Sequence, residues 1–278
     1  MSVTAVGPAL DLDGPLPVAP PHSLLNTPGV RVQRDVHALG GAVVYGYPTG
    51  CAELWDPCSE GTFRTKAEDS EQPLPRFDAF VVYKALQCST MGIGDPVEFR
   101  TRIERVLDAT MSAAVETALA AGFDPSVNPY FGDVNVVDVT PTPGTAVTPG
   151  VGLSLLEQAI GETCRQGMIH ATPAVVSALT TDRLQGEEMN LVTPNGTPVV
   201  SGMGYQGVDT PFLETPDTTE DYMFATGPVS VFLDPVDVLE LRDVVDQATN
   251  TVVFRAERYV LATWDTALQA AVLVDWAA

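Results

Sequence analysis

Basic residues are scarce in this chain of 278 residues. Lysine and arginine together number 14, against 36 aspartate and glutamate residues, and the formal net charge is −22. Proteins that bind nucleic acid neutralise phosphates with lysine and arginine, so groove binding is a poor interpretation of so acidic a chain. The same charge favours solubility and opposes nonspecific association.

Cysteine, histidine and long apolar runs are also few. The candidate metal ligands are Cys51, Cys58, Cys88, Cys164, His22, His37 and His170. No two cysteines have the CxxC spacing and the histidines are far apart, so no zinc site is predicted. Free, partly buried thiols of a reducing compartment are favoured over a metal site or a disulfide. No apolar run reaches the length of a membrane span, and residues 1–16 lack the features of a secretory signal.

Proline and charge shape the first third of the chain. Apolar residues make up 45% of the sequence, enough for one large domain or two small ones. Residues 1–40 carry six prolines, so we expect an extended stretch, either a tail or an arm that neighbouring molecules order. Residues 41–48 and 80–86 are strand-like. The polar, charged stretch 56–75 between them predicts an extended hairpin or flap.

A capped amphipathic helix is the clearest element. Asp95, Pro96 and Glu98 supply an N-cap, a proline at the first helical position and the acid of a capping box. Apolar residues then recur every three or four positions, and Gly122 supplies the stop signal. The pattern predicts a helix of about 26 residues and roughly 39 Å, long enough to be a girder.

Shorter elements fill the rest of the chain. A second helix is predicted from Ser154, with Glu157 completing a capping box, to Gly167. A strand at residues 168–171 and a helix at 172–179 follow. The remaining predicted strands cover residues 191–192, 199–200, 222–233, 236–245, 251–263 and 270–276. The first two flank Asn195-Gly196, a hairpin signal, and the last is apolar enough to lie centrally in a sheet.

The segment from Gly202 to Gly207 matches the pattern GxGxxG. A dinucleotide site needs a helix directly after this pattern, so that the helix N-terminus meets the pyrophosphate. Here the sequence continues VDTPFLETPDTTED, whose prolines and acidic residues oppose a helix. A flexible loop is therefore favoured over nucleotide binding.

Three further features were weighed as sites. His170 lies in a predicted strand without a clear nucleophile and orienting acid, so a structural histidine is favoured over a catalytic base. Asp133 and Asp138 flank a strand-like segment, and a solvated strand face explains them as well as paired-carboxylate catalysis does. Asn195 begins a formal glycosylation sequon that is better interpreted as a turn. No catalytic, cofactor-binding or metal-binding residue is assigned.

The order of the elements resembles the major capsid proteins of tailed bacteriophages, with the Hong Kong 97-type fold, to which encapsulins are also similar. The resemblance covers nearly the whole chain in order and pattern. The charged strand with Arg255, Glu257 and Arg258, followed by the apolar residues 270–274, is its most suggestive part. It implies an α+β fold with an N-terminal arm, an extended loop (E-loop), a peripheral domain with a long spine helix, and an axial domain. The implied parts are the arm 1–40, the E-loop region 41–88, the peripheral domain 89–152, a mainly axial part 153–245 and a return to the peripheral sheet over 246–278.

The resemblance also implies a function. The chain would be a structural subunit that self-assembles through pentamers and hexamers into an icosahedral head around phage DNA, without sequence-specific contact and without enzyme activity or cofactor. Scaffold, portal and decoration proteins are possible partners, and the location is the virion, after assembly in the host cytoplasm. Some relatives crosslink through a loop lysine, and Lys66 and Lys84 are the residues available here. An encapsulin-like compartment and an unrecognised α/β enzyme are the alternatives.

Overall fold

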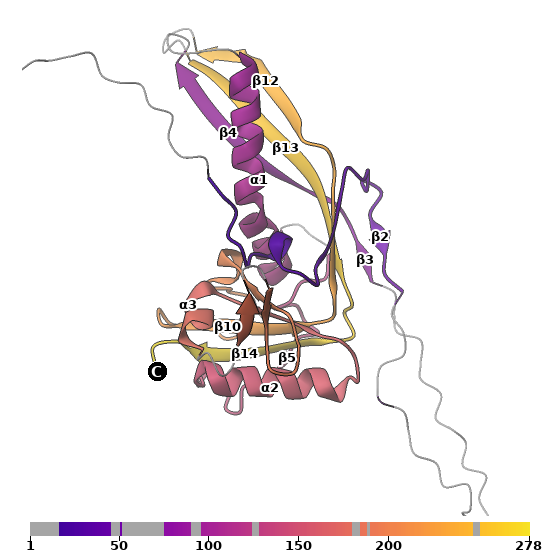
Figure 1. Ribbon diagram of the computed structural model, residues 1–278, viewed down its shortest axis with the longest axis vertical. Coiled ribbons are helices and arrows are strands. Elements are labelled where there is room, and N and C mark those ends of the chain that lie inside the picture. Colours follow the sequence, from indigo (N-terminus) through magenta and orange to yellow (C-terminus); the bar gives the residue numbers. More distant parts are fainter. Residues whose placement is uncertain are drawn as a thin grey trace, which may run out of the picture.

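A computed structural model describes residues 17–45, 51, 75–89, 96–123, 128–179, 184–187, 190–246 and 251–278. Within these residues the chain forms two larger sheets, each with its own helical cover, and two short ribbons (Figure 1). The ribbons pair β2 (Ala42–Val43) with β3 (Arg76–Phe77) and β7 (Gln185–Glu187) with β8 (Asn190–Val192).

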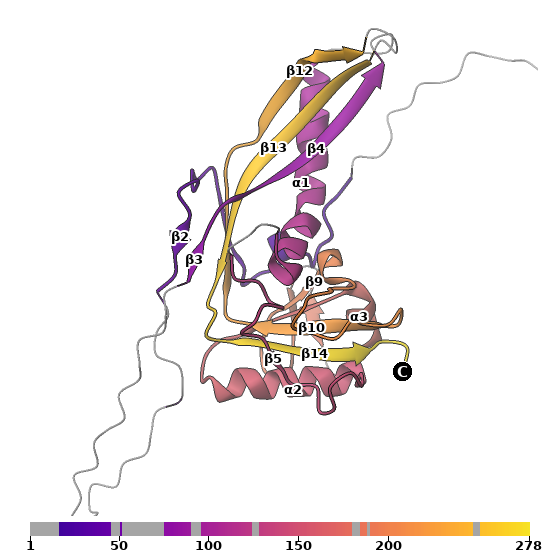
Figure 2. The ribbon, with the colours of Figure 1, turned by 180° about the vertical axis from the view of Figure 1, so that it is seen from behind.

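The first sheet is long and runs beside the helix α1 (Pro96–Ala121). Its path is β1 (Arg31–Arg34), β11 (Val229–Leu233), β13 (Thr251–Trp264) and β12 (Asp237–Asp246), and β4 (Phe80–Ser89) also pairs with β13. Figure 2 shows β4, β12 and β13 running together along the helix. The predicted girder is confirmed, with its 26 residues followed by Gly122 at φ 83°.

One stripe of α1 buries itself on this sheet. Ile103, Leu107, Met111, Val115 and Leu119 recur every four residues and are at most 3% exposed. Residues at this spacing share one face of a helix, so the stripe packs as a continuous ridge on β4 and β13.

The second sheet lies across the lower end of α1. Its order is β5 (Val137–Asp138), β14 (Gln269–Asp275), β10 (Glu220–Thr226), β6 (Met168–Ala171) and β9 (Val199–Ser201). The helices α2 (Pro149–Glu162) and α3 (Pro173–Ala178) belong to this part, and α2 lies along the sheet (Figure 2). The apolar strand β14 lies inside the sheet, between β5 and the middle strand β10.

Both faces of the second sheet are buried. Along β10, Tyr222 and Phe224 enter the core shared with α1, whereas Met223 and Ala225 enter the core shared with α2. Successive side chains of a strand point to opposite faces, so a continuous apolar run requires a cover on each side. The cover comes from α2 and α3 on one face, and from α1 and its neighbouring loops on the other.

The N-terminal region is partly integrated into the subunit. The 3₁₀ turn η1 (Leu24–Asn26) places Leu24 in the core at 0% exposure, and β1 pairs in parallel with β11. The described portion is therefore more than the expected extended tail or arm, because part of it is buried in the subunit's own core. Proline excludes a helix there but permits a short turn and an edge strand.

Several boundaries differ from those predicted. The helix α2 begins at Pro149, behind the extended Thr148, and Ser154 donates to the carbonyl of Gly150 (3.0 Å) and does not cap. The predicted strand 222–233 is two strands in different sheets, β10 and β11. The closing segment is likewise divided, because β13 lies in the first sheet and β14 in the second.

The predicted hairpin at Asn195-Gly196 is present only as a turn. Gly196 has φ 85°, and one bridge joins Val192 to Pro198. The strand β9 pairs with β6 in parallel, while β8 pairs with β7. The predicted helix at 172–179 is confirmed as α3, with the side chain of Thr172 accepting from the amide of Val175 (3.3 Å).

Candidate assembly surfaces

The glycine-rich segment 202–207 packs closely against α1. A Cβ atom on Gly204 would collide with the carbonyl oxygen of Ala113, and one on Gly202 would collide with the carboxylate of Glu116. The segment forms the 3₁₀ turn η3 (Met203–Tyr205), in which Gly204 and Tyr205 are buried. The glycines therefore allow close contact with a helix, and the interpretation as a flexible loop is wrong.

Glu116 joins three segments that are distant in the sequence. Its side chain is 1% exposed, and one carboxylate oxygen accepts from the amide of Leu24 and from the hydroxyl of Ser112, both at 2.9 Å. The other oxygen accepts from the amide of Gly204 at 3.1 Å. A buried carboxylate is costly unless donors satisfy it, and here backbone amides from two other segments do so. Hydrogen bonds to Glu116 thus link α1 to the N-terminal region and to η3.

His170 is a buried, neutral part of the shared core. One ring nitrogen lies 2.9 Å from the hydroxyl of Tyr205 and the other 2.9 Å from that of Thr226. Thr226 donates its proton to the carbonyl of Gly227 (2.9 Å), so Nε2 donates to Thr226 and Nδ1 accepts from Tyr205. Burial lowers the pKa of His170 to about 3. This geometry agrees with a structural histidine.

The pKa of Tyr205, which lies beside His170, is also shifted. Burial, followed by the charge of Glu116, raises the pKa of Tyr205 well above its ordinary value. The ring of Phe131 lies 4.6 Å from that of His170. With aromatic rings and hydroxyls around it, the histidine has the surroundings of a packed core.

The two candidate aspartates have separate structural tasks. Asp133 is 8% exposed and accepts from the side-chain amide of Gln269 (2.7 Å) and from the amide of Asn135 (2.8 Å). Asp138 accepts from the amide of Thr140 at 2.9 Å. Asp133 therefore does not lie on a solvated strand face, because it orders a buried loop.

An ion pair links α1 to the first sheet. Arg258 on β13 is 8% exposed and lies 2.6 Å from the carboxylate of Asp108 on α1. Arg34 of β1 reaches the same carboxylate at 4.0 Å. The pair links α1 to β13 at the edge of their contact, with Arg258 buried and Asp108 exposed.

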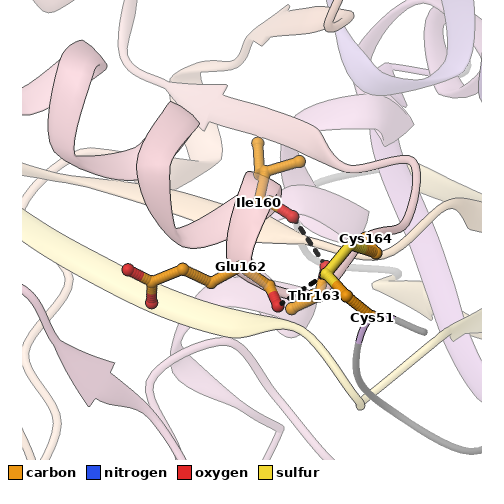
Figure 3. Close-up of a disulfide and its surroundings, with 5 residues drawn as sticks. All are labelled: Cys51, Ile160, Glu162, Thr163 and Cys164. Carbon is orange, nitrogen blue, oxygen red and sulfur yellow. Dashed lines mark hydrogen bonds between the residues drawn. A yellow bond between two sulfur atoms is a disulfide. The ribbon is translucent and has the colours of Figure 1, made fainter. Parts of the chain in front are cut away.

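Two of the four cysteines are joined. Cys51 and Cys164 form a disulfide with their Cα atoms 5.2 Å apart (Figure 3). The prediction of free thiols is therefore wrong for this pair, since residues separated by 113 positions meet only in the fold. The described residues contain no group of three histidine, cysteine, aspartate or glutamate side chains that could hold a metal, and no described helix is long and apolar enough to span a membrane.

Several large apolar side chains of the described residues are exposed, and two groups of them lie on the first sheet and at the β2–β3 ribbon, while others, such as Val134, Val151 and Phe212, lie elsewhere. On the first sheet, the face turned away from α1 carries Val81, Tyr83 and Tyr259, at 36%, 64% and 41% exposure. Val81 and Tyr259 are register partners on β4 and β13, so these residues form one patch, which we call the outer sheet face. Aligned apolar residues on a surface commonly mark contact with another molecule.

The second exposed group lies at the β2–β3 ribbon. Leu39, Val43 and Tyr45 are 56%, 46% and 75% exposed, and we call this group the flap root. Neighbouring Ala42 and Val44 pack on the core, so the ribbon is anchored on one side and apolar on the other. In Figure 1 this ribbon stands apart from α1, across the width of the first sheet.

The fold is that of tailed-phage capsid subunits, as the order of elements predicted. No protein-family model and no curated protein matches the sequence. The chain is similar in structure to the capsid of an empty GTA particle, with 14% identity, a TM-score of 0.57 and coverage of 98% of this chain and 96% of that one. A Gordonia phage Cozz chain matches with 13% identity, a TM-score of 0.55 and coverage of 99% and 91%.

An encapsulin has the same fold. The SrpI encapsulin of Synechococcus elongatus is 10% identical, with a TM-score of 0.53 and coverage of 89% of this chain and 85% of that one. The α+β fold class and the long spine helix are therefore confirmed, and identities this low establish the fold alone.

Proposed function

We propose that the chain is a major capsid subunit that self-assembles into an icosahedral head around phage DNA. The observation that carries the proposal is the agreement of nearly the whole chain with the GTA and phage structures. The girder, the exposed flap root and the outer sheet face suit a subunit that completes its apolar contacts with other copies.

In this proposal the arm and the E-loop region keep the bounds that the sequence suggested, while the peripheral and axial parts follow the two sheets. Residues 1–40 are the arm, of which the portion around Leu24 is anchored in its own subunit, and 41–88 are the E-loop region. The peripheral domain consists of α1 with the first sheet, and the axial domain consists of the second sheet with α2 and α3. The strand β14 then belongs to the axial part.

The net charge of −22 supports a shell that binds its enclosed DNA weakly. Lysine and arginine are too few for extensive phosphate contact, so DNA would be enclosed by confinement and not by adhesion. Other copies of the chain are the main partners in this proposal, and scaffold, portal and decoration proteins are further ones. The location is the virion, after assembly in the host cytoplasm.

An architectural role also suits the buried groups. His170, Glu116 and Asp133 each bind groups of their own subunit and stabilise loops, and the compared GTA and encapsulin chains are shell proteins. We infer a structural protein without enzyme activity or cofactor.

Assembly is the direct test. The purified chain, alone and with a co-expressed scaffold protein, should give rings or closed shells in negative-stain microscopy and a large species in light scattering. A strictly monomeric chain at high concentration under both conditions would overturn the proposal.

The encapsulin match supports a second candidate, a shell around a protein cargo. Particle contents distinguish the two. A phage head contains DNA that is protected from nuclease, whereas a compartment contains a co-purifying enzyme. Neighbouring terminase and portal genes would favour the head, and a neighbouring enzyme with a docking tail would favour the compartment.

A further inference from the structure

We propose that Cys51 and Cys164 form a reversible, redox-controlled tether that fixes the connection between β2 and β3 to the end of α2. The Cα separation of 5.2 Å lies within the range that a disulfide spans. Both residues are exposed, so small thiols and disulfides in solution reach the sulfur atoms. Figure 3 shows Cys51 meeting Cys164 just beyond the last turn of the helix.

The backbone at Cys164 supports a specific role for the thiol. Cys164 has φ 53°, in the left-handed region where glycine is favoured after a helix. Asp35 is the other non-glycine residue of the described chain with positive φ, and aspartate adopts this region more readily than most residues do. Cysteine has no such preference, so a thiol stands where glycine would fit the backbone better.

One end of the tether is firmly held. The amide of Cys164 donates to the carbonyl of Gly161 at 3.1 Å, which continues the last turn of α2. The next residue, Arg165, lies 2.6 Å from the carboxylate of Asp265 in the turn between β13 and β14. Cys164 is therefore a fixed point of the second-sheet region.

At the other end, Cys51 also places its Sγ atom 3.9 Å from the carbonyl oxygen of Glu162. The β2–β3 ribbon pairs Ala42 with Phe77 and Val43 with Arg76, and the amide of Val44 adds one bond to the carbonyl of Pro75 (3.2 Å). Cys51 follows in the connection between these strands. The described ladder is short, and the disulfide adds a covalent link from Cys51 to the end of α2 that reduction removes.

Closing the tether is a two-electron oxidation by a small-molecule disulfide. The thiolate of one cysteine attacks that disulfide, forms a mixed disulfide and releases one small thiol. The second protein thiolate then attacks the protein sulfur of the mixed disulfide and releases the second small thiol. One protein S–S bond forms, one small-molecule S–S bond breaks, and both protons pass to the released thiols.

The timing of the switch rests on the proposed function. In a reducing cytoplasm the cysteines stay as thiols, and Cys51 is not covalently held to Cys164 during assembly. After release into an oxidising medium the tether closes and fixes the assembled arrangement. The tether itself is testable on the isolated subunit, independently of any shell.

The first experiment maps and perturbs the bond in the isolated subunit. After incubation with oxidised glutathione and alkylation of the remaining thiols, mass spectrometry should find the Cys51–Cys164 peptide pair. Reduction should lower the melting temperature of the wild-type chain by about 5 °C, since the closed loop is long. Absence of the linked peptides, or an unchanged melting temperature after reduction, would overturn the proposal.

Four cysteine variants extend the test: two remove one partner of the disulfide, and two are controls. Cys51→Ser and Cys164→Ser should melt at the temperature of the reduced wild type and should not respond to reductant. Cys58→Ser and Cys88→Ser should respond as the wild type does. An undiminished response in Cys51→Ser would overturn the tether. The oxidised and reduced proteins compared here are both wild type, so the test can be carried out even if a variant does not fold.

The second experiment concerns timing. Particles trapped with iodoacetamide at cell lysis should contain free thiols at both positions, and particles exposed to oxidised glutathione should contain the bond and dissociate at a higher temperature. Disulfide already complete at lysis would overturn the switch. If no particles form, the proposed function fails, whereas the melting test still decides the tether.

Discussion

The two sheets of this chain bury their apolar residues in different ways. The second sheet is covered on both faces, by α2 and α3 on one side and by α1 with its loops on the other. The first sheet packs one face on α1, whereas its outer sheet face leaves Tyr83 at 64% exposure. Both faces of the second sheet are thus buried within the subunit, whereas the first sheet leaves apolar side chains exposed on one face, a feature that commonly marks contact with another molecule.

The largest effect should come from breaking the two-sided core. Val272 lies on the inner strand β14 and is 0% exposed. Val272→Asp would bury an unpaired carboxylate and should lower the free energy of unfolding by about 4 kcal/mol. Urea denaturation followed by circular dichroism measures this change.

The neighbouring strand supplies the control. Val137 on β5 is 59% exposed, and Val137→Asp should change the stability by less than about 0.5 kcal/mol. Equal effects of the two substitutions would contradict burial on both faces of the second sheet.

A smaller loss is expected where the two halves join. Glu116→Ala removes the acceptor of the Leu24 and Gly204 amides and leaves both donors buried. Unsatisfied buried donors cost about 1–3 kcal/mol each, so we expect a total loss of about 3 kcal/mol. Glu104→Ala, on the same helix and partly exposed, is the control and should cost about 0.5 kcal/mol or less. A loss no larger than that of the control would show that the junction does not stabilise the subunit.

Acid should weaken the shared core through His170. The unfolded chain protonates this residue below its ordinary pKa of 6.5, whereas the folded chain does so only at a pKa of about 3. The stabilising contribution is therefore complete above pH 6.5 and is lost as the pH falls toward 3, with about 2 kcal/mol lost at pH 5.

The comparison of two pH values isolates that residue. Unfolding at pH 7 and pH 5 should show a loss in the wild type that exceeds the loss in His170→Gln by about 2 kcal/mol. Equal losses in the two proteins would assign the acid sensitivity to other groups.

The smallest effect on the subunit should come from the outer sheet face. Tyr83→Ser should change the unfolding free energy by about 0.5 kcal/mol or less, because the ring is largely exposed. If this face contacts another copy, the same substitution should reduce the yield of particles, measured by sedimentation, while Tyr83→Phe assembles normally. Normal assembly of Tyr83→Ser would remove this face from the contacts.

Local signals predicted elements well, and contacts between distant segments were harder to predict. The helix α1 carries Pro96 at its start and Gly122 just after its end, so its bounds followed from neighbouring residues. The start of α2 was wrong because Ser154 and Glu157 imitate a capping box, while Pro149 marks the actual beginning. Gly227-Pro228 was a signal that could have divided the strand predicted over 222–233.

The roles of several residues depend on long-range packing. Gly202 and Gly204 match a nucleotide pattern, and their purpose became clear only from their contact with α1. Glu116 is one acidic residue among many in the sequence, and nothing local marks it as buried. The Cys51–Cys164 pair required the fold to bring the two residues together.

Two short crossings between the sheets have a consequence for how the two halves are joined. The chain passes from β10 to β11 through residues 227–228 and from β13 to β14 through residues 265–268. The crossings touch, since a Cβ atom on Gly227 would collide with Asp265. The two halves are therefore joined by backbone at two adjacent points, where the chain turns from strands that run along the long axis of the molecule to β10 and β14, which run across it (Figure 1).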